Sequence, residues 1–209
     1  MFVVSSASLV IDQRFENALE NAEGFFMKTG RVHQAALSLA RRLDASHIPY
    51  AIAGAMALGA HGYERATADV DLLLDREGLA RFKAEYLGRG YVEKFPGSKG
   101  MRDTETGVAI DVLIAGDFPG DGRPKPVAFP DPTGAAVAGG RFRILALPTL
   151  IELKLASGMT ASHRLKDLAD VLELIRAAKL TAELSATLNP YVREKYDELW
   201  LAAQIEDPE

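Results

Sequence analysis

The sequence predicts an α+β protein in which a mixed central sheet is flanked by helices and followed by a C-terminal helical lobe. Two apolar runs, residues 69–75 and 107–117, have the length and composition of buried strands. Stretches with apolar residues at helical spacing surround these runs, and from Pro148 onward the pattern is helical. We therefore expect two parts: residues 1–147, a core with an N-terminal helical segment, and residues 148–209, a helical C-terminal lobe.

The first expected elements are a helix, a short strand and a second helix. Residues 31–45 carry apolar side chains in steps of four, three and four, which is the stripe of an amphipathic helix. Residues 47–54 are a short apolar strand ending at Gly54, and the alanine-rich segment after it favours a helix up to Gly62. Gly54 is therefore expected at a strand-to-helix turn.

Strands and helices alternate through the middle of the chain. The strand at 69–75 is followed by an expected helix over 76–90, a strand over 91–95 and the apolar strand at 107–117. Residues 116–134 carry five of the ten prolines, so we expect no regular structure there.

The last expected strand covers residues 140–147, and only helices follow it. Pro148 suits the first turn of a helix, where its missing N–H is not needed. Residues 161–179 place Leu165, Leu168, Val171, Leu172 and Ile175 on one face of a further helix. Asn189 and Pro190 have the residue types that begin a helix, so a final helix is expected after them.

Composition limits the classes of function. The chain has 209 residues, 48% of them hydrophobic, which is ordinary for a globular protein. It has no cysteine, so disulfides, zinc-thiolate sites and a cysteine nucleophile are excluded. The N-terminus has no basic leader and no apolar run approaches the roughly 20 residues that span a bilayer, so we expect a cytoplasmic protein with no membrane partner.

The charge pattern leaves room for one local basic surface. A net charge of −5 argues against general coating of nucleic acid, because such binding depends on neutralising phosphates. Cations are nevertheless grouped in the second half of the chain: Arg123, Lys125, Arg141 and Arg143, and then Lys154, Arg164 and Lys166. Each group is either part of a basic cleft or ordinary solvated surface charge.

Asp69 and Asp71 are the first candidate site residues. Alternate side chains of a strand share a face, so these two carboxylates project together from the strand at 69–75. A D-x-D pair alone is also compatible with a solvated edge strand that carries two surface acids. The run of leucines at 72–74 favours a buried strand instead.

Asp111 is the third candidate. It lies in the middle of Val-Ala-Ile-Asp-Val-Leu-Ile at 108–114, where both faces of the strand are apolar, so we expect little water near its carboxylate. A buried charge needs a cation, a salt bridge or a raised pKa to compensate it. The alternatives to a functional role are an arginine partner or a strand end near solvent.

If the two strands are adjacent, these aspartates form a site for hard divalent cations. Carboxylate oxygens suit Mg²⁺, and a pair of Mg²⁺ ions can stabilise the attacking and leaving oxygens of an in-line displacement. Gly54 and the helix start after it would bring backbone N–H groups toward a phosphate at the same place. The combination favours phosphoryl or nucleotidyl transfer.

The segment AIAGAMALGAHGYERATADVDLLLD at 51–75 resembles the signature of the DNA polymerase beta-like nucleotidyltransferase superfamily, a Gly-Gly or Gly-Ser turn followed by D-x-D. Asp111 matches the third aspartate of that pattern. The block from Lys154 to Asp170 is similar to that of abortive-infection nucleotidyltransferase toxins of the AbiEii type. The resemblance spans residues 50–175 and implies the nucleotidyltransferase fold.

This resemblance implies roles for residues across the chain. Two Mg²⁺ ions would be bound by Asp69, Asp71 and Asp111, and Asp111 would also activate the acceptor. The nucleoside triphosphate would be held by Gly54, Ala55, Arg65, Thr67, Thr160, Arg164 and Lys166, with Lys154 as a catalytic cation and Asp167 and Asp170 orienting these groups.

Two features of the sequence qualify these roles. The second position of the turn is Ala55, so the hydroxyl that serine would bring to the phosphates is missing. Lys166 and Asp170 are four residues apart and would also suit an ion pair on a helix face. Arg65 and Thr67 either brace the strand of Asp69 or reach the nucleotide.

The implied reaction moves a nucleoside monophosphate from a triphosphate to an acceptor, and the resemblance implies tRNA or protein as that acceptor. It further implies a toxin-like or phage-defence role with a cognate antitoxin. One alternative is a transferase for small hydroxylated molecules of the aminoglycoside or lincosamide type. Another is a catalytically degenerate nucleotide-binding module.

Overall fold

The computed structural model describes residues 30–205, so the first 29 residues of the expected core at 1–147 lie outside the described part. The helices are α2 (Arg31–Ala45), α3 (Gly54–Ala60), α4 (Arg76–Tyr86), α5 (Pro132–Ala135), α6 (Leu147–Thr160), α7 (Leu165–Ala177) and α8 (Pro190–Ala203), with 3-10 turns η1 (Ser162–Arg164) and η2 (Ala182–Thr187). The strands are β1 (Ala51–Ile52), β2 (Asp69–Leu74), β3 (Tyr91–Glu93), β4 (Met101–Asp103), β5 (Ala109–Ile114), β6 (Ala136–Gly139) and β7 (Phe142–Leu145).

All seven of these strands join one mixed sheet in the order β3-β4-β5-β2-β1-β7-β6. The pairs β2–β5 and β1–β7 are parallel, whereas β1–β2, β3–β4, β4–β5 and β6–β7 are antiparallel. The two longest strands, β2 and β5, therefore lie side by side in the middle of the sheet. The predicted mixed sheet flanked by helices is confirmed.

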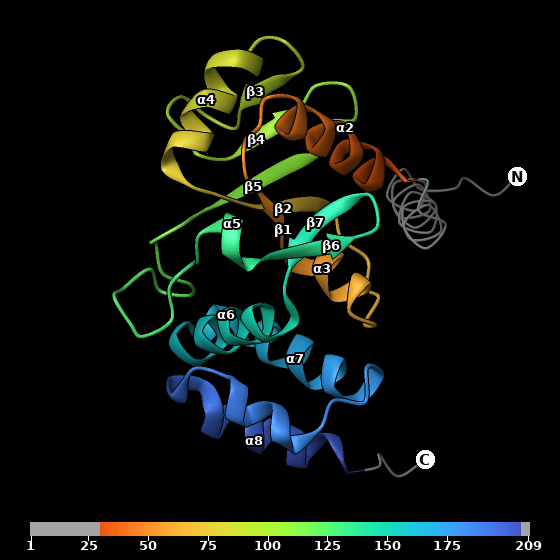
Figure 1. Ribbon diagram of the computed structural model, residues 1–209, viewed down its shortest axis with the longest axis vertical. Helices are drawn as coiled ribbons and strands as arrows, with labels where there is room; N and C mark the ends of the chain where they lie inside the picture. The colour runs from red at the N-terminus through yellow and green to blue at the C-terminus, as the bar shows by residue number, and fades with distance from the viewer. Residues whose placement is uncertain (1–29, 206–209) are drawn as a thin grey trace, which may run out of the picture.

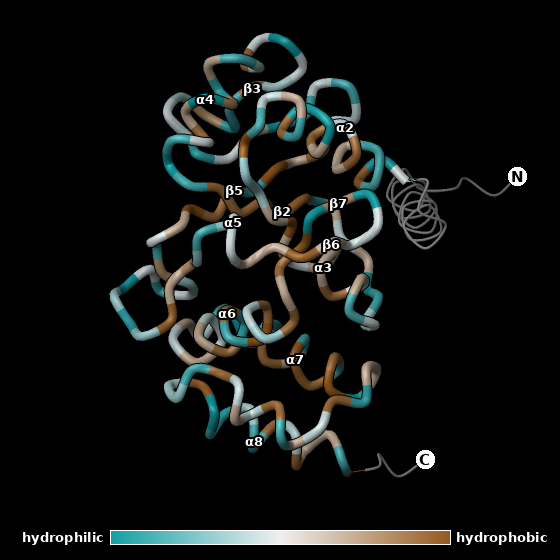
Figure 2. Tube along the Cα trace, viewed as in Figure 1, coloured by the Kyte–Doolittle hydropathy of each residue, from teal (hydrophilic) through white to brown (hydrophobic). Residues whose placement is uncertain are grey.

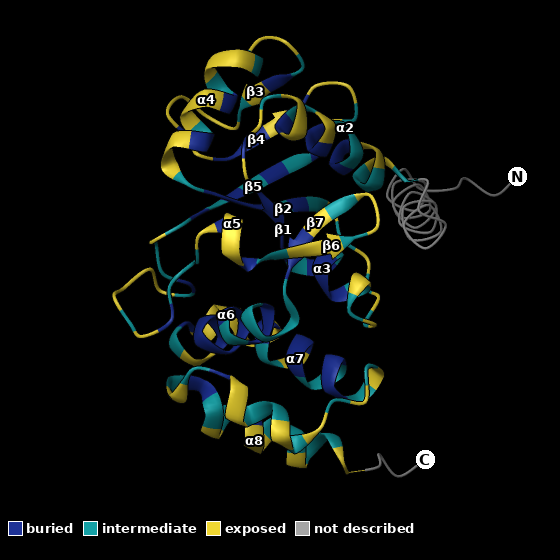
Figure 3. Cartoon of the chain, viewed as in Figure 1, coloured by how far each residue is buried: buried dark blue, intermediate teal, exposed yellow. Residues whose placement is uncertain are grey.

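The two faces of β2 and β5 have different surroundings. Ile110, Val112 and Ile114 of β5 are buried and alternate with half-buried residues on the other face. Hydrophobic residues run along the central strands, and the same strands are buried together with the inward sides of α6 and α7 (Figures 2 and 3). One face of the central strands is thus closed, and the other is partly open.

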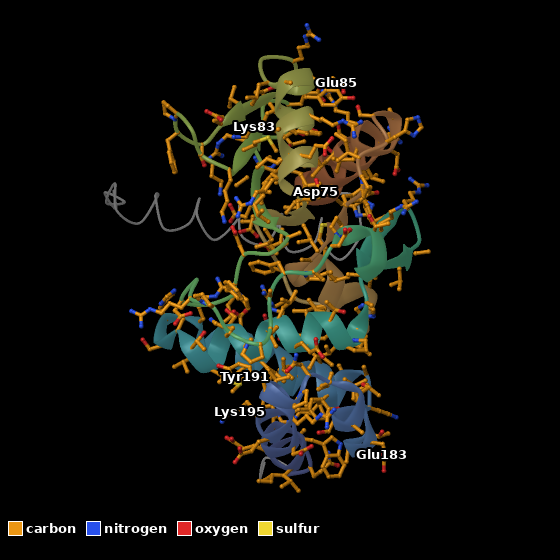
Figure 4. The ribbon with its side chains drawn as sticks, turned by 60° about the vertical axis from the view of Figure 1, so that its left-hand side comes forward. Asp75, Lys83, Glu85, Glu183, Tyr191 and Lys195 are labelled. Carbon is orange, nitrogen blue, oxygen red and sulfur yellow. The ribbon has the colours of Figure 1, made fainter. Side chains whose placement is uncertain are left out.

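The longer helices divide between the two ends of the molecule, whereas the short helices α3 and α5 lie between them beside the sheet (Figure 1). The helix α2 packs on β2 and β7 near α4, whereas α6, α7 and α8 pack on one another at the opposite end. Figure 4 labels residues of these ends, with Asp75, Lys83 and Glu85 at α4 and Glu183, Tyr191 and Lys195 around η2 and α8. The predicted division at residue 147 into a core and a lobe stays a prediction.

Several expected boundaries are confirmed by the structure. The helix at 31–45 is α2, the turn at Gly54 begins α3, and Asn189 caps α8 by accepting a hydrogen bond from the Tyr191 amide at 3.0 Å. No helix among residues 30–205 combines the length and the apolar character needed to cross a bilayer.

Other expectations were wrong in detail. The strands β4 and β6 were not predicted, since each is only three or four residues long and is stabilised by pairing with a neighbouring strand. A short helix, α5, begins inside the proline-rich stretch at 116–134, where Asp131 caps it. Leu165 was expected on a buried face but is 64% exposed, because it is the first residue of α7.

Candidate active site

The three aspartates share one face of the sheet. The parallel pairing of β2 with β5 sets Asp71 opposite Asp111 and Asp69 opposite Ala109. Because the two strands run in the same direction and in register, the side chains of paired residues project to the same side. The prediction that the Asp111 strand lies beside the Asp69 and Asp71 strand is confirmed.

Asp71 is the most shielded carboxylate of the three. Burial and the neighbouring Asp69 and Asp111 charges raise its pKa from 3.8 to about 6, although Lys154 and Arg164 oppose this shift. Such crowding of carboxylates favours a proton or a cation at this position. The raised pKa of Asp71 therefore indicates that the positive charge of Lys154 and Arg164 does not fully compensate this carboxylate.

Gly54 makes the close approach to Asp71 possible. Its φ of +57° is in the left-handed region, and a Cβ built on it would lie 1.8 Å from Asp71 Oδ2. Only glycine satisfies both the backbone conformation and the space. The backbone at the start of α3 therefore lies directly against the carboxylate.

The sequence predicts that Asp111 is shielded from water, and this prediction is wrong. Its side chain is 44% exposed and forms an ion pair with Lys94 from the loop between β3 and β4. The prediction failed because apolar neighbours in sequence do not close both faces of a strand. On this face Ala109 and Leu113 are only half-buried, and the cleft is open beside them.

The three aspartates have the ligand chemistry that a hard cation requires, but their side chains are not oriented to bind one together. Among residues 30–205 no group of three histidine, cysteine or carboxylate side chains is positioned to hold a metal ion. Asp69 instead accepts a hydrogen bond from the Thr67 hydroxyl at 2.6 Å, and Asp111 pairs with Lys94. Three carboxylates on one face of the sheet still supply the oxygen donors that Mg²⁺ prefers.

A cleft of about 360 Å³ opens over the aspartates. One wall is the sheet, with Asp69, Asp71 and Asp111, and the other is α6 and the start of α7. The predicted site residues that line the cleft are Gly54, Arg65, Thr67, Asp69, Asp71, Asp111, Lys154, Arg164, Lys166 and Asp167. Most of the site predicted from sequence is thus brought to one place.

Lys154 lies at the buried end of the cleft and is held by two aspartates. Its ammonium is 3.1 Å from Asp167 Oδ1 and 2.6 Å from Asp170 Oδ2, and all three side chains are less than a tenth exposed. Arg65 binds the same Asp170 with two nitrogens, at 2.8 and 3.0 Å. These charges join the loop before β2 to α6 and α7.

Asp167 gathers three donors. Besides Lys154, it accepts from the Ser157 hydroxyl at 2.7 Å and from Arg164 Nε at 2.8 Å. These contacts hold the pKa of Asp167 below its usual value despite its burial. The guanidinium of Arg164 is half exposed and can still face a ligand in the cleft.

Among the predicted residues, Thr160 and Ala55 lie off the cleft wall, whereas Lys166 lines the cleft. Lys166 is exposed and makes no ion pair within the described part of the chain, so the ion pair with Asp170, the alternative to a role at the nucleotide, does not form. Thr160 is not on the cleft wall; its hydroxyl donates to the Ala156 carbonyl and accepts from Lys125. Ala55 is buried in α3 behind Gly54.

Sequence reasoning missed several residues of the cleft. Lys99, Phe118, Phe129, Ser157 and His163 also line it. Ser157 could have been found, because it follows Lys154 by one helical turn. His163 lies in η1, whereas Lys99, Phe118 and Phe129 come from loops whose positions depend on the order of strands in the sheet. Strand order has no signal in the local sequence.

A second hollow, of about 480 Å³, lies on the far side of α3 beside the β6–β7 turn. Its lining is largely apolar and includes Met56, Phe142 and Ile144. It contains none of the predicted site residues, so we place the chemistry in the smaller cleft.

No protein-family model matches the chain, and no curated protein is significantly similar to it in sequence. Among solved structures, the crystal structure of ANT(2'')-Ia in complex with adenylyl-2''-tobramycin has a TM-score of 0.48 at 18% identity, covering 81% of this chain and 94% of that chain. The solution structure of antibiotic-resistance factor ANT(2'')-Ia has a TM-score of 0.45 at 20% identity, covering 81% and 90%. JHP933 from Helicobacter pylori has a TM-score of 0.35 at 18% identity, covering 82% and 87%.

Proposed function

We propose that this chain is a metal-dependent nucleotidyltransferase of the DNA polymerase beta-like superfamily, which moves a nucleoside monophosphate from a nucleoside triphosphate to an acceptor. One observation carries the proposal. Asp71 and Asp111 are register partners on adjacent parallel strands, Asp69 precedes them on the same face, and this face opens on a cleft. Three convergent carboxylates in a cleft suit divalent cations and phosphate esters.

The aspartates would hold two Mg²⁺ ions. Bound there, the ions would neutralise charge on the phosphates and on the leaving pyrophosphate. The Asp111 side chain is 44% exposed, and its second oxygen is free to accept a proton from an acceptor hydroxyl. Gly54 lets the backbone of α3 approach the same place without a side chain.

The opposite wall of the cleft supplies positive charge for the triphosphate. Arg164 and Lys166 face the cleft from η1 and α7 and are not buried. Lys154 is enclosed by Asp167 and Asp170, so we assign it the role of positioning this wall and adding positive potential. The phosphates would lie between these cations and the aspartates.

The acceptor separates two forms of this proposal. Similarity to AbiEii-type toxins in residues 154–170 favours tRNA or protein, a toxin-like or phage-defence role and a cognate antitoxin. The alternative acceptor is a small hydroxylated molecule of the aminoglycoside or lincosamide type, and the solved complex of ANT(2'')-Ia contains an adenylylated tobramycin. Both forms use the same aspartates.

A transfer assay tests the proposal and identifies the acceptor. The protein and its Asp69→Asn variant are incubated with Mg²⁺, each α-labelled nucleoside triphosphate, and either total tRNA, protein extract or a panel of aminoglycosides and lincosamides. We expect label on one acceptor class with the wild type, and at least about a hundredfold less with the variant. Equal nucleotide binding by both proteins with no transfer would instead support a degenerate binding module.

A further inference from the structure

Lys94 is a cation at the aspartates that the proposed reaction does not use. Its ammonium pairs with Asp111, and its side chain is only 28% exposed. It is not part of the cleft wall, so it reaches Asp111 from the β4 side of β5 and not through the cleft. Asp111 thus has a lysine on one side and Asp71 on the other.

The side chain of Lys94 packs closely against Gly100 on its way to Asp111. A Cβ at this position would lie 3.1 Å from Lys94 Cδ and 3.3 Å from the Ile110 carbonyl oxygen. The aliphatic part of Lys94 therefore crosses the backbone of Gly100, at the point where β4 is about to pair with β5. A larger residue at Gly100 would therefore force the Lys94 side chain to shift by a few tenths of an ångström.

The loop that carries Lys94 is anchored to the rest of the protein. Lys83 of α4, labelled in Figure 4, donates to the Ser98 carbonyl at 2.5 Å and to Glu93 at 2.6 Å. Glu93 also accepts from the Gly97 amide at 2.8 Å, and the Lys94 amide donates to the Gly100 carbonyl at 3.1 Å. The hydrogen bonds fix the loop that carries Lys94. This lowers the conformational entropy that is lost when Lys94 forms its ion pair with Asp111.

We propose that Lys94 is a built-in substitute for a divalent cation at Asp111. This inference rests on the proposed function, because it takes the aspartates to be metal ligands. In the protein without metal, the ammonium balances the charge of one carboxylate in a crowded group. A metal ion that binds Asp111 has to displace the ammonium or share the carboxylate with it, so Lys94 weakens binding of the metal on its own.

As a consequence, the site should bind a metal ion more tightly together with the triphosphate than alone. The triphosphate brings anionic oxygens that bind the same ion and offset the cost of displacing Lys94. Lys94 would then be released toward the phosphates or the acceptor. It is a positioning residue in this account, since it acts on the reaction through Asp111.

The test measures metal affinity without turnover. Binding of Mn²⁺ alone, in the absence of nucleotide, is followed by the electron paramagnetic resonance signal of the free ion for the wild type and for Lys94→Gln and Lys94→Met. We expect each variant to bind Mn²⁺ about tenfold more tightly, because a cation in contact with one ligand is removed. Lys94→Arg keeps the charge and should stay within about threefold of the wild type.

Lys99→Met is the matched control. Lys99 lines the same cleft, but its nearest carboxylate is Asp117, at 3.7 Å, and not one of the three aspartates. We expect its loss to change Mn²⁺ affinity by no more than about threefold, since exposed charges at a distance are screened. Circular dichroism of each variant confirms that the fold is retained, and the glutamine variant is used if the methionine variant does not fold.

The outcomes separate this inference from the proposed function. Mn²⁺ binding by the wild type that is unchanged or weakened in both Lys94 variants would overturn the substitute role and leave the nucleotidyltransferase proposal standing. Failure of the wild type and all variants to bind Mn²⁺, with or without nucleotide, would overturn both. Tighter binding confined to Lys94→Gln and Lys94→Met supports the inference.

Discussion

At the scale of single residues, the site depends on the contact between Gly54 and Asp71. The backbone at the start of α3 and the carboxylate of β2 occupy adjoining space, and no side chain separates them. The carboxylate is thereby held at the turn that begins a helix. Two substitutions probe this contact from its two sides.

Gly54→Ala should damage both stability and activity. Its Cβ would overlap Asp71 Oδ2, and the φ of +57° is strained for alanine. We expect a loss of about 1–3 kcal/mol in the free energy of unfolding and a severe loss of transfer. Chemical denaturation and the transfer assay measure the two effects.

Gly59→Ala is the control within the same helix. Its Cβ would meet nothing closer than Glu64 Cγ at 3.8 Å, and its φ is ordinary. Alanine should stabilise α3 by up to about 1 kcal/mol. An equal loss in the two alanine variants would argue against the special role of Gly54.

Asp71→Asn should stabilise the metal-free protein while it abolishes transfer. The folded pKa of Asp71, about 6, is above its ordinary 3.8, so its ionisation destabilises the fold and the penalty grows as pH rises through about 6. Asparagine removes this charge, and we expect a gain on the order of 2 kcal/mol at pH 7 that vanishes near pH 4. Urea denaturation at the two pH values without metal gives the comparison; no gain at pH 7 would contradict it.

At the scale of elements, buried charges join the sheet to the C-terminal helices. Lys154 of α6 lies between Asp167 and Asp170 of α7, and Arg65, from the loop before β2, binds Asp170. Buried ion networks of this kind are costly to break, since the remaining charges lose their partners. They are better suited to fixing one arrangement of helices than to adding net stability.

Lys154→Met should therefore destabilise the protein by about 3 kcal/mol or more, because Asp167 and Asp170 would remain buried with fewer partners. Lys166→Met, on the exposed side of the same cleft, should change stability by less than about 0.5 kcal/mol. The expected effect of Lys166→Met is weaker nucleotide binding, measured by titration calorimetry. Thermal melts that rank the two variants the other way would contradict these roles.

The same elements show what sequence can and cannot predict. The helices at 31–45 and after Asn189 and the strand at 69–75 follow from local periodicity and capping, and the structure contains them. The exposure of Asp111 and its pairing with Lys94 do not follow, because they depend on which strand lies beside β5 and on which face stays open. Long-range pairing has no signature in a short window of residues.

At the scale of the whole molecule, the two walls of the cleft come from separate parts of the chain. The aspartates belong to the sheet, whereas Arg164 and Lys166 belong to the helical end that follows it (Figure 1). A ligand between them contacts both sides at once. Its binding should therefore stabilise the molecule as a unit.

Mg²⁺ and nucleoside triphosphate together should raise the melting temperature. At a ligand concentration about a hundred times Kd the gain is about 2.7 kcal/mol, or roughly 5–10 °C for a chain of this size. The shift should be absent in Asp69→Asn and much smaller with either ligand alone. A full shift from triphosphate without metal would separate nucleotide binding from the aspartates.

The in-register pairing of β2 with β5 also bears on how the chain tolerates insertions. Asp71 meets Asp111 only because the two strands are aligned residue for residue. A slip of one position would turn Asp111 to the opposite face, among the buried side chains. An extra residue in the turn at 104–107 can be absorbed as a longer loop, but one placed at 109–110 would leave a folded sheet without its third carboxylate. Length is therefore as constrained as residue type along this strand.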